Sequence, residues 1–396
     1  MLPFEFYSPT KFVFGPKAEL QVGPVLEAAG FRKIMIVTGK SSAFESGLYD
    51  RVKKSLDEAG ITHVLLRGVE PNPRADLVYE GIEQGRKEEI ELVLGVGGGS
   101  AIDTAKAISI GIPYSGDFWD FYSYKATPEE ALPVATILTL PATGSEASNS
   151  SVITNAELGD KRGVNSDLIR PKFSFMNPEL SFTLPDYQIA CGVTDIMAHI
   201  LERYLTKTEE VKLTDEMAEA VLRVLLQEGK RALEEPDNYE ARANLYWAGT
   251  LAHNNLLGVG RQQDWSSHQL EHELSTKYGV AHGAGLAIVL PNFMRYTVDE
   301  IPARYARLAI NVFGIEPSPD SVKITALEGI KAFQRFLKGM GMPLTLQEIG
   351  GKKEDIPGLA KNTRLNNQGK YTGFLKPLDE AAREEVYELC LETPKL

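Results

Sequence analysis

The chain has 396 residues, more than a single hydrophobic core usually supports, so two domains are the default expectation. Its formal net charge of −12 argues against nucleic acid or an anionic membrane as the main partner, because binding phosphates needs a basic surface. The first residues lack the basic and apolar segments of a signal peptide, and no apolar run approaches the length of a membrane span. Two distant cysteines, Cys191 and Cys390, favour a reducing compartment over a disulfide framework. We therefore expect a cytoplasmic protein that acts on small molecules.

Short β-rich runs alternate with amphipathic segments up to about residue 180. Buried strands are expected at 34–37, 63–66, 92–96 and 134–140. Helices are expected between them, as at 48–59 and 75–87. After Pro185 helical periodicity takes over, as at 214–233 and 241–256. The pattern predicts an α/β domain with a parallel sheet at 1–182 and an all-helical domain at 183–396.

The predicted strand at 92–96 ends in a glycine-rich turn that opens a helix. Its residues are Gly97, Gly98, Gly99 and Ser100. Without side chains, such a turn lets a pyrophosphate approach the amides of the helix N-terminus, where the helix dipole favours negative charge. The run lacks the last glycine of the Rossmann fingerprint and the acid that should follow it. A turn that serves only close helix packing is the plain alternative.

Two more polar loops follow predicted strands, at the sheet edge where open α/β folds bind ligands. One carries hydroxyls that could bond a ribose, amide or phosphate, with turn and helix-cap duty as the alternative: Thr139, Thr143 and Ser145. The other begins at Gly39, which leaves room, and continues with side chains that could hold an extra phosphate: Lys40, Ser41 and Ser42. The three loops together predict one nucleotide site.

Side chains that bind metals gather in the helical half. Asp195 and His199 are four residues apart, so a helix presents them on one face. His268 and His272 repeat that spacing, and His282 follows. Five candidates exceed the four ligands usual for zinc, so spacing alone leaves the choice among them open. Because these residues and the glycine loops belong to different halves, the sequence predicts an active site in the cleft between the halves.

Five segments combine these features: 97–106, 141–146, 195–199, 268–272 and 282–285. Together they resemble the motifs of the iron-containing alcohol dehydrogenases, the group III family, close to its NADP-dependent butanol dehydrogenase or aldehyde reductase branch. The resemblance covers essentially the whole chain. It implies an N-terminal dinucleotide domain related to that of dehydroquinate synthase, a helical metal-binding domain and a homodimer.

The resemblance also implies a ligand set for one divalent ion, Fe²⁺ or Zn²⁺, made of Asp195, His199, His268 and His282. His272 then lines the substrate pocket and is a candidate for moving the proton.

For the cofactor, the resemblance places the pyrophosphate at Gly97 to Ser100. It places Asp103, which is also a catalytic candidate, with Thr139 and Thr143 near the nicotinamide, and Lys161 near the ribose. Relatives that prefer NAD tend to carry an acid at the position of Gly39, so its absence favours NADP(H) over NAD(H).

The expected reaction is reversible hydride transfer between NADP(H) and a primary alcohol or small aldehyde, assisted by the metal. Three alternatives remain open at this point. They are a lyase like dehydroquinate synthase on the same scaffold, a glycerol dehydrogenase, and a non-catalytic protein that binds nucleotide and metal.

Overall fold

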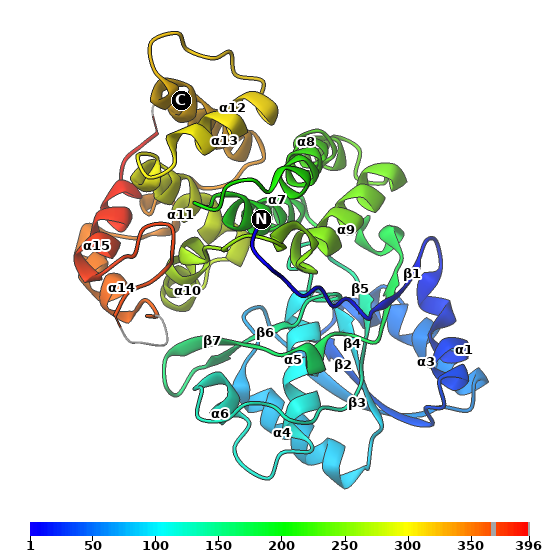
Figure 1. Cartoon of the computed structure of the whole chain (residues 1–396). Coiled ribbons are helices and arrows are strands. Elements are labelled where there is room, and N and C mark those ends of the chain that lie inside the picture. The colour runs from blue at the N-terminus through cyan, green and yellow to red at the C-terminus, as the bar shows by residue number, and fades with distance from the viewer. Residues whose placement is uncertain (366–369, 395–396) are drawn as a thin grey trace. The chain divides into compact units, whose positions relative to one another are not determined.

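The computed structural model describes residues 1–365 and 370–394, which divide into two compact units (Figure 1). The sheet unit comprises Tyr7–Leu184 and Asp237–Asn254. The helical unit comprises Met1–Phe6, Pro185–Pro236 and Asn255–Leu396. The expected domain limits, 1–182 and 183–396, stay a prediction. The two units differ from them mainly in the first six residues and in one helix of the C-terminal half, which joins the sheet unit.

The sheet unit is built on six parallel strands in the order β1-β8-β5-β4-β2-β3. Their bounds are β1 Lys11–Phe14, β2 Lys33–Gly39, β3 Thr62–Val69, β4 Leu92–Gly97, β5 Val134–Leu138 and β8 Phe173–Met176. An antiparallel hairpin, β6 Ser150–Asn155 and β7 Asp160–Asn165, follows β5. The expected parallel α/β fold is therefore confirmed.

Helices cover both faces of this sheet (Figure 1). They are α1 Val22–Ala28, α2 Ser42–Glu45, α3 Leu48–Glu58, α4 Ala75–Lys87, α5 Gly99–Gly111 and α6 Trp119–Tyr122. Helix α9 Tyr239–His253, from the C-terminal half, also belongs to the sheet unit, where Tyr246 packs with Leu138 and Met176 at the ends of β5 and β8. Successive residues of β2 enter different cores: Ile34 and Ile36 pack with α1 and α3, whereas Met35 and Val37 pack with α4 and α5. Alternation of this kind explains why buried strands read as continuous apolar runs.

The helical unit contains α7 Asp186–Tyr204, α8 Lys212–Glu234, α10 Ser266–Tyr278, α11 His282–Thr297, α12 Pro302–Asn311, α13 Val322–Gly339, α14 Ile356–Asn362 and α15 Glu380–Leu389. This confirms the expected helical character of the C-terminal half. Helix α7 is buried on all sides from Ile189 to Tyr204, which marks it as the central helix of the unit. Among the described helices, none combines the length and apolar character that a membrane span needs.

Candidate metal centre and nucleotide loops

Four predicted ligands converge within the helical unit. The Oδ1 atom of Asp195 lies 3.7 Å from Nδ1 of His199, from Nε2 of His268 and from Nε2 of His282. Ligands of a tetrahedral ion with bonds of about 2.1 Å lie roughly 3.4 Å apart. The ligand atoms of Asp195, His268 and His282 all lie within 4.8 Å of one another, so these three are spaced to hold one ion, and His199 joins them through its contact with Asp195. Among the described residues, Oδ1 of Asp195 and Nε2 of His268 are buried without a hydrogen-bond partner. Such atoms are costly unless a ligand satisfies them, and one carboxylate with three imidazoles fits a divalent metal.

Two buried carboxylates hold the imidazole rings from behind. Glu202 contacts Nδ1 of His268, and Glu271 contacts Nδ1 of His282. Glu202 also accepts the backbone N–H of Ser267 at 2.7 Å. A carboxylate on Nδ1 fixes the ring so that Nε2 remains available to the metal. Neither acid was predicted from the sequence. Their signal was spacing: Glu202 lies two helical turns after Asp195, and Glu271 one turn after His268.

These carboxylates give the centre a negative potential. Burial lowers the pKa of the His268 imidazole, but Glu202 and Asp195 together more than compensate and raise it to about 9. A cation at this place is therefore stabilised, whether it is a proton or a metal ion.

Glycines of helix α11 allow it to approach the centre closely. A Cβ atom on Gly283 would lie 2.1 Å from the carbonyl oxygen of Cys191 in α7, and one on Gly285 would lie 2.6 Å from Oε1 of Glu271 in α10. Larger residues would push α11, and with it His282, away from the other ligands. This explains the glycines that follow His282 in the sequence.

The predicted pyrophosphate loop connects β4 to α5. Gly97 has a φ of 154°, which only glycine adopts easily. A Cβ on Gly99 would lie 2.5 Å from Oγ1 of Thr143, and the N–H of Thr139 donates to the carbonyl of Gly97 at 3.0 Å. The structure therefore brings the glycine turn and the second polar loop together at the carboxyl end of the sheet, as the sequence predicts.

Asp103 links α5 to this loop and to the hairpin. Its Oδ1 accepts the hydroxyl of Ser145 at 2.6 Å, and its Oδ2 accepts the N–H of Val152 at 2.9 Å. Burial raises the pKa of Asp103, and the nearby Lys106 ammonium opposes that shift. Because both oxygens bind protein donors, Asp103 shapes the loop. Its expected catalytic role stays a prediction.

Helix α9 supports the second loop from within the sheet unit. The Thr250 hydroxyl donates to Oε1 of Glu146 at 2.7 Å, and Nδ1 of His253 lies 2.6 Å from the carbonyl oxygen of Thr143. Both acceptors belong to the loop at 139–146. The His253 ring therefore contacts a residue of the predicted nucleotide site.

The third polar loop follows β2. A Cβ on Gly39 would meet only the carbonyl oxygen of Val69, at an ordinary 3.6 Å, so the position itself is not crowded. The Lys40 ammonium pairs with the carboxylate of Glu70. Ser41 and Ser42 follow at the start of α2.

Lys161, the predicted ribose contact, lies on β7. Its ammonium donates to Oδ1 of Asn72 at 3.0 Å. Asn72 belongs to the segment that follows β3, which also contains Glu70. The roles of Lys40 and Lys161 in nucleotide binding stay predictions.

Comparison with known proteins identifies the family. The family model described as iron-containing alcohol dehydrogenase matches residues 9–178, and the model for the C-terminal part of the Fe-containing alcohol dehydrogenase family matches residues 189–390. The chain belongs to the iron-containing alcohol dehydrogenase family. The resemblance deduced from the motifs is thereby confirmed, and the protein is an oxidoreductase of this family.

Similar members of the family differ in the cofactor that their names state. NADH-dependent butanol dehydrogenase A of Clostridium acetobutylicum is 42% identical over 390 residues, covering 98% of this chain and 99% of the relative. NADPH-dependent aldehyde reductase YqhD of Escherichia coli is 34% identical over 368 residues, covering 90% and 92%. The crystal structure of NADH-dependent butanol dehydrogenase A of Thermotoga maritima is 40% identical and superimposes with a TM-score of 0.96, covering 99% of both chains.

His272 lies beside the metal centre of this alcohol dehydrogenase. Its ring centroid is 5.8 Å from that of His282, and it groups with Glu271 and His282 as a second set of possible ligand atoms. Its expected place in the substrate pocket, rather than on the metal, therefore stays a prediction.

Trp265 forms an aromatic wall against two of the ligands. Its ring meets those of His199 and His268 edge-on, with centroids 6.0 and 5.2 Å apart. The guanidinium of Arg203 lies 4.4 Å from the centre of the indole, and Arg203 also donates to the carbonyl of His199 at 2.8 Å. The indole thus packs between the Arg203 guanidinium and the two imidazoles, and these contacts help to hold the rings in place.

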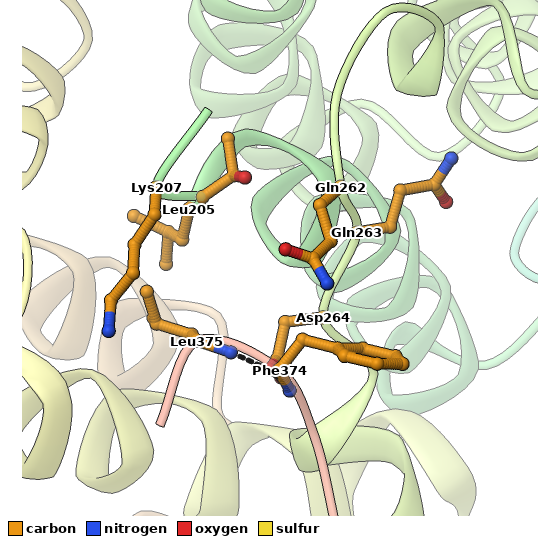
Figure 2. A pocket seen from close by; sticks show the side chains of 8 residues that line it. Leu205, Lys207, Gln262, Gln263, Asp264, Phe374 and Leu375 are labelled. Atoms are coloured by element: carbon orange, nitrogen blue, oxygen red, sulfur yellow. Dashed lines mark hydrogen bonds between the residues drawn. The ribbon is translucent and has the colours of Figure 1, made fainter. Parts of the chain in front are cut away.

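A further small pocket of the dehydrogenase lies elsewhere in the helical unit (Figure 2). It is lined by Leu205, Thr206, Lys207, Gln262, Gln263, Asp264, Phe374 and Leu375. Oδ2 of Asp264 accepts the backbone N–H groups of Phe374 and Leu375 at 2.6 and 2.7 Å, which fixes that wall of the pocket. None of the predicted site residues lines it.

Proposed function

We propose that the chain catalyses reversible hydride transfer between a nicotinamide cofactor and a primary alcohol or small aldehyde, using one divalent ion, Fe²⁺ or Zn²⁺. The observation that carries this proposal is the set of three 3.7 Å separations around Oδ1 of Asp195, with two of the imidazoles held by buried carboxylates. When bound, such an ion supplies Lewis-acid chemistry toward an oxygen substrate. The names of the similar relatives, butanol dehydrogenase and aldehyde reductase, support the substrate class.

The protein's own groups then have separate tasks. Asp195, His199, His268 and His282 hold the ion, and Trp265 shields two of the imidazoles. His272 transfers a proton between the substrate oxygen and solvent when the hydride is transferred, a task that suits imidazole near neutral pH. The amides of the turn at 97–100 bind the pyrophosphate, and the loop at 139–146 meets the nicotinamide end.

The cofactor choice is the finer part of the proposal. Open space at Gly39 supports the predicted preference for NADP(H) over NAD(H). The similar relatives include both NADH-dependent and NADPH-dependent enzymes, so the preference stays a prediction.

We also propose a homodimer formed through the edge of the sheet. Strand β1 is one of the two edge strands of the sheet and pairs with β8. Phe14 at its end is 41% exposed and packs edge-on against Trp247, which is 42% exposed. A second copy placed on this edge would cover both rings and the free side of the strand. Light scattering that gives the mass of one chain at micromolar concentration would rule out the dimer. The cytoplasmic location stays a prediction.

The experiment that tests the reaction follows NADPH and NADH consumption with butanal on chelator-stripped protein, before and after addition of Fe²⁺ or Zn²⁺. We expect little turnover without metal and its return with metal. Protein that binds both metal and nucleotide but turns over neither cofactor would contradict the proposal and return attention to a lyase or a non-catalytic binding protein.

A further inference from the structure

A short segment after β3, Glu70 to Arg74, touches both lysines that were assigned to the nucleotide site. Glu70 pairs with Lys40, and Asn72 accepts the ammonium of Lys161 at 3.0 Å. The carbonyl of Pro73 accepts the N–H of Thr154 in the hairpin at 2.7 Å, which fixes the segment on that side. No role for this segment was predicted from the sequence.

The sheet register places Glu70 beside the loop that follows β2. Strand β2 lies between β4, which carries the glycine turn, and β3. All three strands are parallel, so their carboxyl ends share one edge. Gly39 pairs with Val69, and Glu70 comes next. In dinucleotide-binding α/β folds, an acid near the glycine turn binds the ribose 2′-hydroxyl, and a cation in its place accommodates a 2′-phosphate.

We propose that Glu70 sets the choice between NAD(H) and NADP(H). Its carboxylate accepts the 2′-hydroxyl of the adenosine ribose in NAD(H), and it opposes the 2′-phosphate of NADP(H) by repulsion and by occupying Lys40. The acid that is missing at Gly39 is thus supplied from the neighbouring strand, and its charge acts against the preference for NADP(H) that the absence of an acid at Gly39 predicts. This inference rests on the proposed function, since it assumes that the sheet unit binds a nicotinamide dinucleotide.

The charges around Glu70 support this assignment. The hydrogen bond from Lys40 lowers the pKa of the Glu70 carboxyl, so it is ionised at neutral pH and faces a phosphate of nearly two negative charges. The nearby cations already have partners. Arg67 donates to the carbonyl of Lys40 and stacks on Phe44 at 4.1 Å, and Arg74 pairs with Asp76.

The test is the variant Glu70→Gln, which keeps the shape of the side chain and removes its charge. The matched control is Glu88→Gln. Glu88 forms a similar half-exposed pair with Lys33, 2.9 Å long, at the opposite end of β2. Dissociation constants are measured for NADH and NADPH, and for AMP and adenosine 2′,5′-bisphosphate as probes that need no turnover.

We expect Glu70→Gln to tighten NADPH and the bisphosphate by about five-fold or more relative to NADH and AMP, the scale of one exposed charge pair. The control should leave these ratios unchanged. Raising the salt concentration should shrink the difference between wild type and Glu70→Gln. If the wild type binds both dinucleotides and Glu70→Gln leaves their ratio unchanged, the role of Glu70 is refuted while the proposed function stands. If the wild type binds neither dinucleotide, both proposals fail together.

Discussion

The candidate metal centre and the predicted nucleotide loops differ in the kind of group that would bind the ligand. At the metal centre, charged side chains project from buried helices, and two further carboxylates hold imidazoles from behind. In the predicted nucleotide loops, glycines permit close approach of the backbone, and single hydrogen bonds tie the loop at 139–146 to α5 and α9. In the first arrangement a few charged groups contribute most of the binding free energy. In the second, many weaker contacts contribute a little each.

This difference predicts how each region responds to substitution. Removal of one partner from a buried charge network leaves an uncompensated charge, which costs several kcal/mol in typical cases. Removal of one neutral hydrogen bond typically costs about 1 kcal/mol. Changes at the metal centre should therefore abolish a function, and changes in the loops should only weaken binding.

The largest effect is expected for Asp195→Asn. Its Oδ1 lies 3.7 Å from a nitrogen of each of the three imidazoles, so loss of its charge should release the ion and lower turnover roughly a thousand-fold, in line with the several kcal/mol that a metal supplies. Metal content by elemental analysis and aldehyde reduction are the measurements. Asp186→Asn, an exposed acid in the first turn of the same helix, is the control. Asp195→Asn with full metal content would mean that the ion lies elsewhere.

The variant His272→Ala tests whether His272 transfers a proton or binds the metal. Turnover should fall by about a hundred-fold or more, the usual contribution of a positioned acid or base, while one equivalent of metal is retained. The measurements are metal stoichiometry and the rate at saturating cofactor. Because His272 also groups with Glu271 and His282, loss of the metal in this variant would make it a ligand and overturn the assignment.

Glu202→Gln and Glu271→Gln test the support behind the imidazoles. Either change should weaken metal binding by about ten- to a hundred-fold, because the ring loses the acceptor that orients it. Competition with a chelator of known affinity measures the effect, and excess metal should restore much of the activity. Exposed Glu209→Gln controls for the loss of one negative charge. Unchanged metal affinity in both variants would show that packing alone orients the rings.

The sequence predicted the fold because its signals are local. Buried parallel strands such as 92–96 appear as apolar runs, and helices such as 75–87 show their own period. It did not predict that α9 joins the sheet unit, because helical periodicity indicates that a segment is helical but not which elements it packs against. The hairpin strand Asp160–Asn165 was missed as well, since it is polar and only partly buried.

At the site, too, local signals do not reveal residues whose role is to hold another side chain in place. Asp195 and His199 were readable because they share one helix face, as were His268 and His272. Glu202 and Glu271 were not, because acids are common on helices and the helical spacing of these two from Asp195 and His268 is by itself a weak signal. Glu70 required the register between β2 and β3, which no single strand reveals.

The smallest effect is expected at His253, in the nucleotide region. Its Nδ1 contacts the carbonyl of Thr143, and Gly144 leaves no room for a Cβ, which would lie 2.5 Å from that of His253. His253→Leu should therefore let the loop shift and weaken nucleotide binding about five- to ten-fold, the scale of one neutral hydrogen bond. Turnover at saturating cofactor and metal content should change little.

The conservative variant His253→Asn decides whether the hydrogen bond is responsible. An asparagine amide can donate from nearly the position of Nδ1, so it should restore most of the affinity that leucine loses. His63→Leu, which removes a half-buried ring on β3 that contacts Tyr49 of α3, controls for the loss of an imidazole. Equal binding by the Asn and Leu variants would assign the effect to packing. Loss of metal in either variant would contradict the separation between the two regions, because it would make a residue of the nucleotide region necessary for the metal centre.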